Sequence, residues 1–317
     1  MRYFALILVT FASICAYSQY SLSKVDSLVI SKKYKSTDVK ELSKEIASDF
    51  KSDSNKIRAF YIYVVKNIKY DITLSNRVWH PKSIEDMDRI TLLEVNNCIK
   101  NKKGICWDYS ALFQKLCFYQ GIEVEHIGGT KRTIEIMSEN RTVNHGWNSL
   151  TINGKRKFID CTFVPPDEYI KSEYDKYYLV APEEFIYTCL PDDPSKQYLK
   201  STVSYEQFKS LAYVQSAFYE HKIKKLFPNF LNIKINEKAQ YLVTFQISNI
   251  DKLTSIEVYV NDKFIQSIKE IKSNMIMNLK LKLVPGDKIE FMSVVTVTKN
   301  ENGLIETIAP LFTYVAI

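Results

Sequence analysis

A two-residue turn near the middle of the chain constrains the fold more tightly than any other segment. Asn153-Gly154 stands between residues 144–152 and 155–161, two segments rich in apolar and β-branched side chains. Asn-Gly favours a tight hairpin turn because both residues tolerate a positive φ. The pattern therefore predicts two antiparallel strands whose register is set by the turn.

A helix is predicted ahead of these strands. Over residues 104–120 apolar side chains recur at i and i+4, as in Leu112 with Leu116, and Gly121 follows as a stop signal. A helix followed by antiparallel strands predicts an α+β core, a helix packed on an antiparallel sheet. Residues 71–101 show no clean period, and we interpret them as a long crossover with short turns.

The pattern of the chain changes after Pro228. Six segments then alternate between apolar and polar residues as strands do: 240–248, 255–260, 263–268, 276–283, 288–298 and 304–315. Short strands separated by Asn, Asp, Pro and Gly turns are typical of a β-sandwich. The 317 residues are enough for two domains. We expect a first domain over residues 19–230 and an immunoglobulin-like β-sandwich over residues 231–317.

The first 18 residues have the layout of a secretory signal peptide. Arg2 precedes an apolar run, and small residues stand at Ala16 and Ser18, the positions that a signal peptidase reads. We expect cleavage after Ser18 and export to the periplasm or the extracellular space. Lipidation at Cys15 is the alternative, although Ile14 stands where a small residue is usual. No later segment has the length and apolarity of a transmembrane helix.

Charge and cysteine spacing exclude several classes of protein. The net charge is +7, but the basic residues are spread along the chain rather than gathered in the stripe that a nucleic-acid binder needs. There is no Cys-x-x-Cys pair for zinc and no calcium loop motif, so we predict no metal and no cofactor. Five cysteines remain after signal removal, an odd number that leaves at least one thiol unpaired in a monomer.

Three residues of the predicted helix and hairpin suit nucleophilic catalysis. Cys106 stands at the start of the predicted helix, where unpaired N–H groups and the helix dipole stabilise a thiolate. His145 opens the first strand of the hairpin and Asp160 ends the second, so the pairing of the strands brings them side by side. A carboxylate on one imidazole nitrogen fixes the tautomer that the other nitrogen needs as a base. The set therefore predicts a Cys106, His145 and Asp160 triad.

Each of these residues has an ordinary structural interpretation when taken alone, and so do four aromatic residues nearby. A lone cysteine is most often a small buried side chain. Trp79 is the candidate second oxyanion donor, with a packed aromatic as the alternative. Trp107, Tyr109 and Trp147 are candidates to line a substrate cleft, with core packing as the alternative for each. His80, His126 and His221 have no partners at ligand spacing, and we interpret them as surface or strand residues.

The motifs around the triad resemble a known family. Gly104-x-Cys106-x-Asp108-Tyr109-Ser110, His145-Gly146-Trp147-Asn148 and Ile159-Asp160-x-Thr162-Phe163 are similar to the transglutaminase-like core shared by papain-related thiol enzymes. Residues 177–214, including Pro182-Glu183-Glu184-Phe185 and Pro191-Asp192-Asp193-Pro194, resemble the kyphoscoliosis peptidase branch of that family. This branch usually has a histidine after Thr188, where the chain has Cys189.

The resemblance implies a thiol enzyme that acts on amide bonds, with Cys106, His145 and Asp160 as its catalytic residues. It implies a protein or peptide substrate, with cell-envelope peptides among the candidates. Peptidase or amidase activity is favoured over cross-linking, although the sequence does not separate water from an amine as the second substrate. The alternative is a catalytically silent binding or scaffold protein of the cell envelope, because the family includes inactive relatives.

Overall fold

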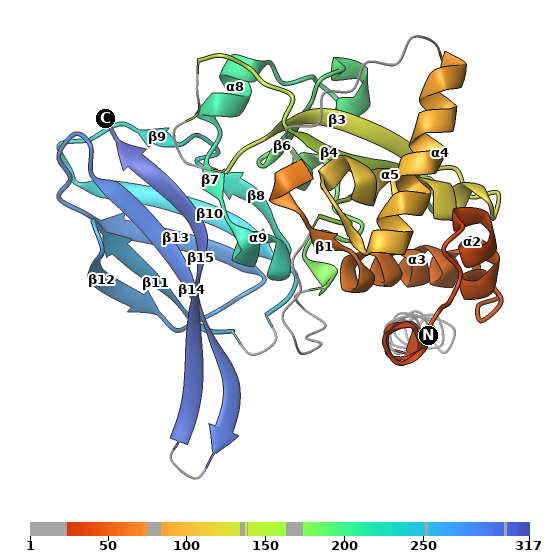
Figure 1. Cartoon of the computed structure of the whole chain (residues 1–317). Helices are drawn as coiled ribbons and strands as arrows, with labels where there is room; N and C mark the ends of the chain where they lie inside the picture. The colour runs from red at the N-terminus through yellow and green to blue at the C-terminus, as the bar shows by residue number, and fades with distance from the viewer. Residues whose placement is uncertain are drawn as a thin grey trace, which may run out of the picture. The chain divides into compact units, whose positions relative to one another are not determined.

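The computed structural model describes residues 24–74, 84–133, 137, 139–162, 174–250, 253–300 and 303–317. The chain divides into two compact units, Met1–Ile127 with His145–Tyr178, and Gly128–Asn144 with Leu179–Ile317 (Figure 1). The predicted signal peptide lies outside the described residues. Among the described residues, no helix combines the length and apolarity needed to cross a membrane.

Helix α5 (Cys106–Phe118) is the central element of the first unit. It packs against three other helices, α2 (Val39–Ala47), α3 (Asp53–Asn67) and α4 (Ile84–Asn101), and against strand β4 (His145–Ile152). Four of its side chains are completely buried, Leu112, Phe113, Leu116 and Cys117. A short parallel pair, β1 (Lys69–Tyr70) with β2 (Lys103–Gly104), leads into α5, and a 3-10 turn at Ile72–Leu74 follows β1.

The hairpin predicted around Asn153-Gly154 is present. Strand β4 pairs antiparallel with β5 (Lys155–Ile159), and the register runs from Asn148 opposite Ile159 to Ile152 opposite Lys155. Asn153 and Gly154 have φ values of 50° and 70°, which is the backbone that this turn requires. The helix and the antiparallel strands confirm the predicted α+β class.

Residues 71–101 differ from the prediction, because most of this segment is helix α4 rather than a crossover with short turns. Its last two turns bury Val95, Cys98 and Ile99, three positions with helical spacing. Leu92 and Leu93 are exposed beside them. These two apolar side chains lie off the buried face and obscure the helical period in the sequence.

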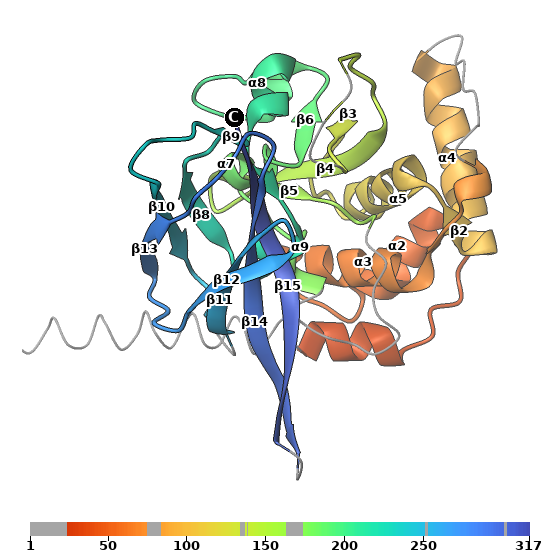
Figure 2. The same ribbon diagram turned by 90° about the vertical axis from the view of Figure 1, so that its left-hand side faces the viewer.

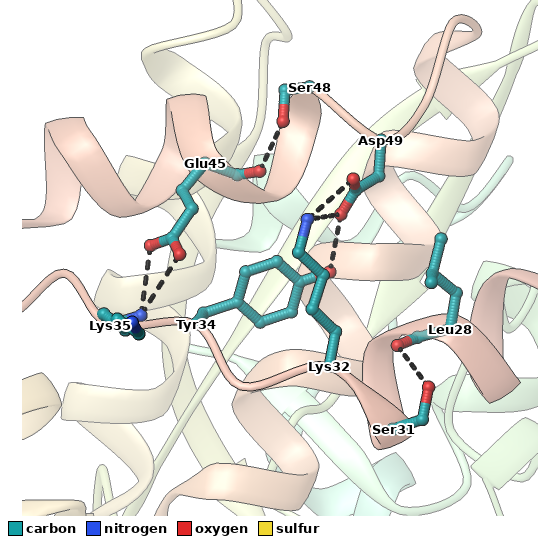
Figure 3. Close-up of polar contacts among 8 residues, drawn as sticks. All are labelled: Leu28, Ser31, Lys32, Tyr34, Lys35, Glu45, Ser48 and Asp49. Atoms are coloured by element: carbon teal, nitrogen blue, oxygen red, sulfur yellow. Dashed lines mark hydrogen bonds and ion pairs between the residues drawn. The ribbon is translucent and has the colours of Figure 1, made fainter.

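An N-terminal segment is bound to the C-terminal end of α2 and to the residues that follow it (Figure 3). Lys32 Nζ lies 2.6 Å from a carboxylate oxygen of Asp49, and the hydroxyl of Tyr34 donates to the same carboxylate. The backbone N–H of Lys35 donates to Glu45. The ring of Tyr34 meets Tyr63 edge to face, with 5.9 Å between centroids. These contacts hold the segment against the helical layer that supports α5.

Strand β3 (Glu125–Lys131) begins in the first unit and continues into the second, where it pairs with β6 (Cys189–Pro191). The second unit also holds short helices α7 (Pro182–Phe185), α8 (Tyr205–Ser210) and α9 (Ser216–Glu220), and a 3-10 turn at Pro194–Gln197. Its remaining strands form two sheets.

The two sheets make a β-sandwich. One sheet has the order β13-β10-β8 and the other β12-β11-β14-β15-β7, with β9 alongside β15. Phe245 of β10 meets Phe312 of β15 edge to face across the core, with 5.4 Å between centroids. The bounds are β7 Tyr213–Val214, β8 Ile223–Phe227, β9 Asn232–Ile233, β10 Gln240–Ile247, β11 Leu253–Val260, β12 Lys263–Ile268, β13 Asn274–Lys280, β14 Lys288–Asn300 and β15 Gly303–Ala316.

The six strands predicted from alternation are all present, in close to their predicted positions. Strands β14 and β15 form a long hairpin that extends past the other strands of this unit (Figure 2). Strands β7 and β8 come before residue 230 and pair with β15 and β10. The domain limit expected near residue 230 therefore falls inside the second compact unit, between β8 and β9.

Candidate active site

His145 and Asp160 form a buried pair. The Nε2 atom of His145 lies 2.8 Å from Oδ2 of Asp160, and the two residues are 6% and 1% exposed. The hairpin register explains the pairing, because extending it by one residue sets Asp160 opposite Trp147, one same-face position from His145. The contact fixes the orientation of the imidazole. Asp160 binds Nε2, so Nδ1 is the ring nitrogen that can face a nucleophile.

Asp160 is itself held at its side chain and at its backbone. Its Oδ1 accepts a hydrogen bond from the backbone N–H of Thr162 at 2.9 Å. The backbone N–H of Asp160 donates to the carbonyl of Tyr177 at 3.1 Å. With both carboxylate oxygens engaged, Asp160 can present only one face to His145.

The segment that carries Tyr177 is anchored by a completely buried arginine. The guanidinium of Arg58 makes two hydrogen bonds to Asp26, at 2.8 and 2.7 Å, and lies 2.8 Å from a carboxylate oxygen of Asp175. It also stacks over the ring of Tyr178, 4.5 Å from the centroid. Arg58 thus joins helix α3 to the segment that holds the backbone of Asp160.

Cys106 is the first residue of α5, and a neighbouring carboxylate caps this helix. Ile105 occupies the N-cap position and has no side chain that can cap, so Asp108 folds back and accepts the Ile105 N–H at 2.8 Å. A Cβ on Gly104 would lie 2.6 Å from Cβ of Asp108, closer than real Cβ contacts allow. Glycine is therefore required at position 104 for close approach, and the cap leaves Cys106 at the positive end of the helix dipole.

The first turn of α5 lies directly on the start of β4. A Cβ on Gly146 would lie 3.2 Å from Oγ of Ser110 and 3.3 Å from Cδ2 of Trp107, so a larger residue here would force these neighbours to shift by a few tenths of an ångström. The side-chain amide of Asn148 reinforces the contact by donating to the carbonyl of Ser110 at 3.0 Å. Gly146 follows His145 and Ser110 lies one turn after Cys106, so this packing draws together the segments that carry the two candidate residues.

The three aromatic residues proposed for a substrate cleft have different environments. Tyr109 is buried, and its hydroxyl donates to the carbonyl of Ile68 at 2.6 Å. Trp147 is completely buried and stacks on His145, with 6.0 Å between ring centroids. Trp107 is 39% exposed. Of the three, Trp107 alone offers surface to a substrate in this structure. Trp79, the oxyanion candidate, lies outside the described residues.

Sequence reasoning assigned no function to His126, Ser110 or Asn148. His126 lies on β3, within 2.9 Å of Oγ of Ser110, and its ring packs on Trp107. Burial lowers the pKa of His126 to about 4, so its imidazole is neutral near pH 7. No local pattern in the sequence indicates these contacts, because they join β3, α5 and β4.

The five cysteines of the described residues are buried and free of disulfide bonds, namely Cys98, Cys106, Cys117, Cys161 and Cys189. Burial raises the pKa of Cys117 and of Cys161, which keeps both as neutral thiols. Within the described residues, no group of three or more His, Cys, Asp or Glu side chains is arranged to hold a metal ion.

A polar pocket of about 520 Å³ opens beside the first turn of α5. Its lining includes Asp108 of the helical cap together with carboxylate, amide and lysine side chains from the segments that precede α5. The residues are Asp71, Leu74, Glu94, Asn97, Cys98, Asn101, Lys103 and Asp108.

Comparison with known families agrees with this geometry. Residues 40–162 match the family model described as the transglutaminase-like superfamily, and this range includes Cys106, His145 and Asp160. Residues 40–162 are thus similar to a transglutaminase-like domain. The helix and hairpin that carry the three candidate residues both lie within this range.

Curated relatives are similar at modest identity. Kyphoscoliosis peptidase of Mus musculus is 24% identical over 211 residues, which is 63% of this chain and 30% of the relative. Lim and transglutaminase domain protein ltd-1 of Caenorhabditis elegans is 24% identical over 258 residues, 74% of this chain and 33% of the relative. The chain thus spans about a third of their length. A solved TGase structure is 16% identical, with a TM-score of 0.28, over 51% of this chain and 40% of that one.

The contact between Gly104 and Asp108 yields a prediction. Gly104→Ala should lower the free energy of unfolding by about 1–3 kcal/mol, because the new Cβ displaces the capping side chain. In an Asp108→Gly background, which removes the three atoms nearest to the new Cβ, the same change should cost far less. Urea unfolding of the four proteins measures this coupling. An equal cost in both backgrounds would contradict the role given to Gly104.

Proposed function

We propose that this chain is a thiol enzyme that cleaves or transfers the acyl group of a peptide amide, with Cys106, His145 and Asp160 as its catalytic residues. The observation that carries the proposal is the buried 2.8 Å contact between His145 and Asp160. Strand β4, which begins at His145, packs against helix α5, which begins at Cys106. The substrate class, a protein or peptide of the cell envelope, is part of the proposal.

The chemistry follows from the arrangement of the groups. His145 takes the thiol proton on Nδ1, and the Cys106 sulfur attacks the amide carbonyl carbon. The tetrahedral intermediate collapses as the carbon–nitrogen bond breaks, and His145 gives the proton to the departing amine. The product of this half-reaction is a thioester on Cys106. Asp160 keeps the ring oriented and stabilises the imidazolium without itself accepting the proton.

The negative charge of the tetrahedral oxygen needs hydrogen-bond donors. The backbone N–H of Cys106 belongs to the first turn of α5, at the positive end of the helix dipole. We propose this N–H as one donor and the indole of Trp79 as the second. In the second half-reaction, water attacks the thioester, its proton passes to His145, and the carboxylic acid leaves with the thiol restored. We favour water over an amine as the acceptor.

One observation favours the alternative of a silent scaffold. Cys106 is only 4% exposed and His145 only 6%, so a peptide has little access to them in this conformation. A binding protein that retains the fold would need no such access. Reactivity of Cys106 toward a small reagent separates the two functions, because iodoacetamide is far smaller than a peptide.

We also propose that the chain is exported, with cleavage after Ser18, on the strength of its N-terminal sequence. The expected mature protein begins at Gln19. Intact-mass measurement of protein recovered from the periplasm or medium tests this, and a lipid-modified Cys15 would contradict it.

Alkylation of the five cysteines tests the catalytic proposal. We expect iodoacetamide to label Cys106 rapidly near pH 6 because His145 pairs with its thiolate. His145→Ala should slow this labelling by roughly tenfold or more, and Asp160→Asn should slow it less, since Asp160 acts only through the ring. Peptide mass spectrometry reads the rates.

Two buried cysteines supply the internal control. Cys117 and Cys161 should stay unlabelled in every variant that remains folded, because each is at most 1% exposed. Labelling of Cys106 and Cys98 at equal rates, indifferent to both substitutions, would favour the scaffold over the enzyme.

A further inference from the structure

A second histidine lies where three elements of the first unit meet. His126 is on β3, and its Nε2 atom is 2.9 Å from Oγ of Ser110 on α5. Its ring packs on the indole of Trp107 at a centroid distance of 4.9 Å. On β4, a Cβ at Gly146 would lie 3.2 Å from the same Nε2. His126 thus lies beside Trp107, which follows Cys106, and beside Gly146, which follows His145.

The hydroxyl of Ser110 connects this ring to the nucleophile's own backbone. Its oxygen lies 2.9 Å from the carbonyl oxygen of Cys106 and 3.1 Å from that of Trp107. A hydroxyl has one proton and a carbonyl can only accept, so the carbonyl contacts of Ser110 are hydrogen bonds only when its proton points to a carbonyl rather than to His126. All of these contacts are satisfied together when Nε2 of His126 carries the imidazole proton and donates it to Oγ of Ser110.

The neutral state of the ring fits this direction. With its pKa lowered by burial, His126 holds a single N–H near neutral pH. Placed on Nε2, this N–H completes a chain from His126 to Ser110 and on to the Cys106 carbonyl. Asn148 fixes the other end of Ser110 by donating to its carbonyl. Ser110 is therefore held at both its side chain and its backbone.

We propose that His126 is a positioning residue, which sets the placement of Cys106 against His145 through Ser110. The inference rests on the proposed function, because it concerns the same nucleophile. Reacting groups in an enzyme must be placed to within a fraction of an ångström, and a small rotation of the first turn of α5 would move the Cys106 sulfur relative to the His145 ring.

Three substitutions separate this role from simple packing. His126→Gln keeps a side-chain N–H at about the reach of Nε2, whereas His126→Leu fills similar space beside Trp107 without a donor. Ser110→Ala removes the connecting hydroxyl and little else. Iodoacetamide labelling of Cys106 at pH 6.5 is the readout, and the buried Cys117 and Cys161 report unfolding in the same sample.

We expect His126→Leu to slow labelling of Cys106 about three- to tenfold, the size of one hydrogen bond, while Cys117 and Cys161 stay protected. Ser110→Ala should slow it by a similar factor, and His126→Gln should recover the wild-type rate to within about twofold. The Ser110→Ala/His126→Leu double variant should be no slower than the slower single variant, because both substitutions break the same chain.

A wild-type rate in His126→Leu with Cys117 protected would overturn the proposal, and so would a His126→Gln variant as slow as His126→Leu. If His126→Leu unfolds and exposes Cys117, Ser110→Ala decides, and a wild-type rate in that variant would overturn the proposal. Failure of the proposed function looks different, since Cys106 would then label equally in the wild type and in His145→Ala.

Discussion

The close packing of the first turn of α5 on the first residues of β4 is the constraint on which the candidate site depends. Gly146 permits it, since any larger side chain would meet Ser110 and Trp107. Gly104 lets Asp108 fold back and cap the same helix turn, because a Cβ at position 104 would meet the Asp108 side chain. Two glycines thus allow the helix turn that carries Cys106 to be capped by Asp108 and to pack on the strand that carries His145.

Polar groups around this contact act on orientation rather than on stability alone. Asp160 is held by Thr162 and by Tyr177, and the segment of Tyr177 is anchored by the buried Arg58. A buried ion pair often stabilises the fold no more than an apolar replacement would. The ion pair of Arg58 therefore matters here for the position in which it holds the segment of Tyr177. The arrangement is that of a site in which supporting residues restrict each catalytic side chain to one orientation.

Much of this structure could be predicted from local sequence patterns. The Asn153-Gly154 turn fixed the hairpin register, and alternation located the strands of the sandwich. Helix α4 was missed because Leu92 and Leu93 lie off its buried face. The role of Asp108 was missed because its partner is the N–H of Ile105, a residue with no capping side chain. His126 could not be assigned because its contacts join three elements that are distant in sequence.

The central claim is that Cys106 forms a thioester with a peptide acyl group while His145 handles the proton. The most direct measurement is acid quenching of the protein with a mixture of short peptide p-nitroanilides, followed by mass mapping of the adducts. The account predicts an acyl group on the Cys106 peptide that neutral hydroxylamine removes, and far less of it in His145→Ala. No adduct on folded wild-type protein, or equal acylation in His145→Ala, would contradict it.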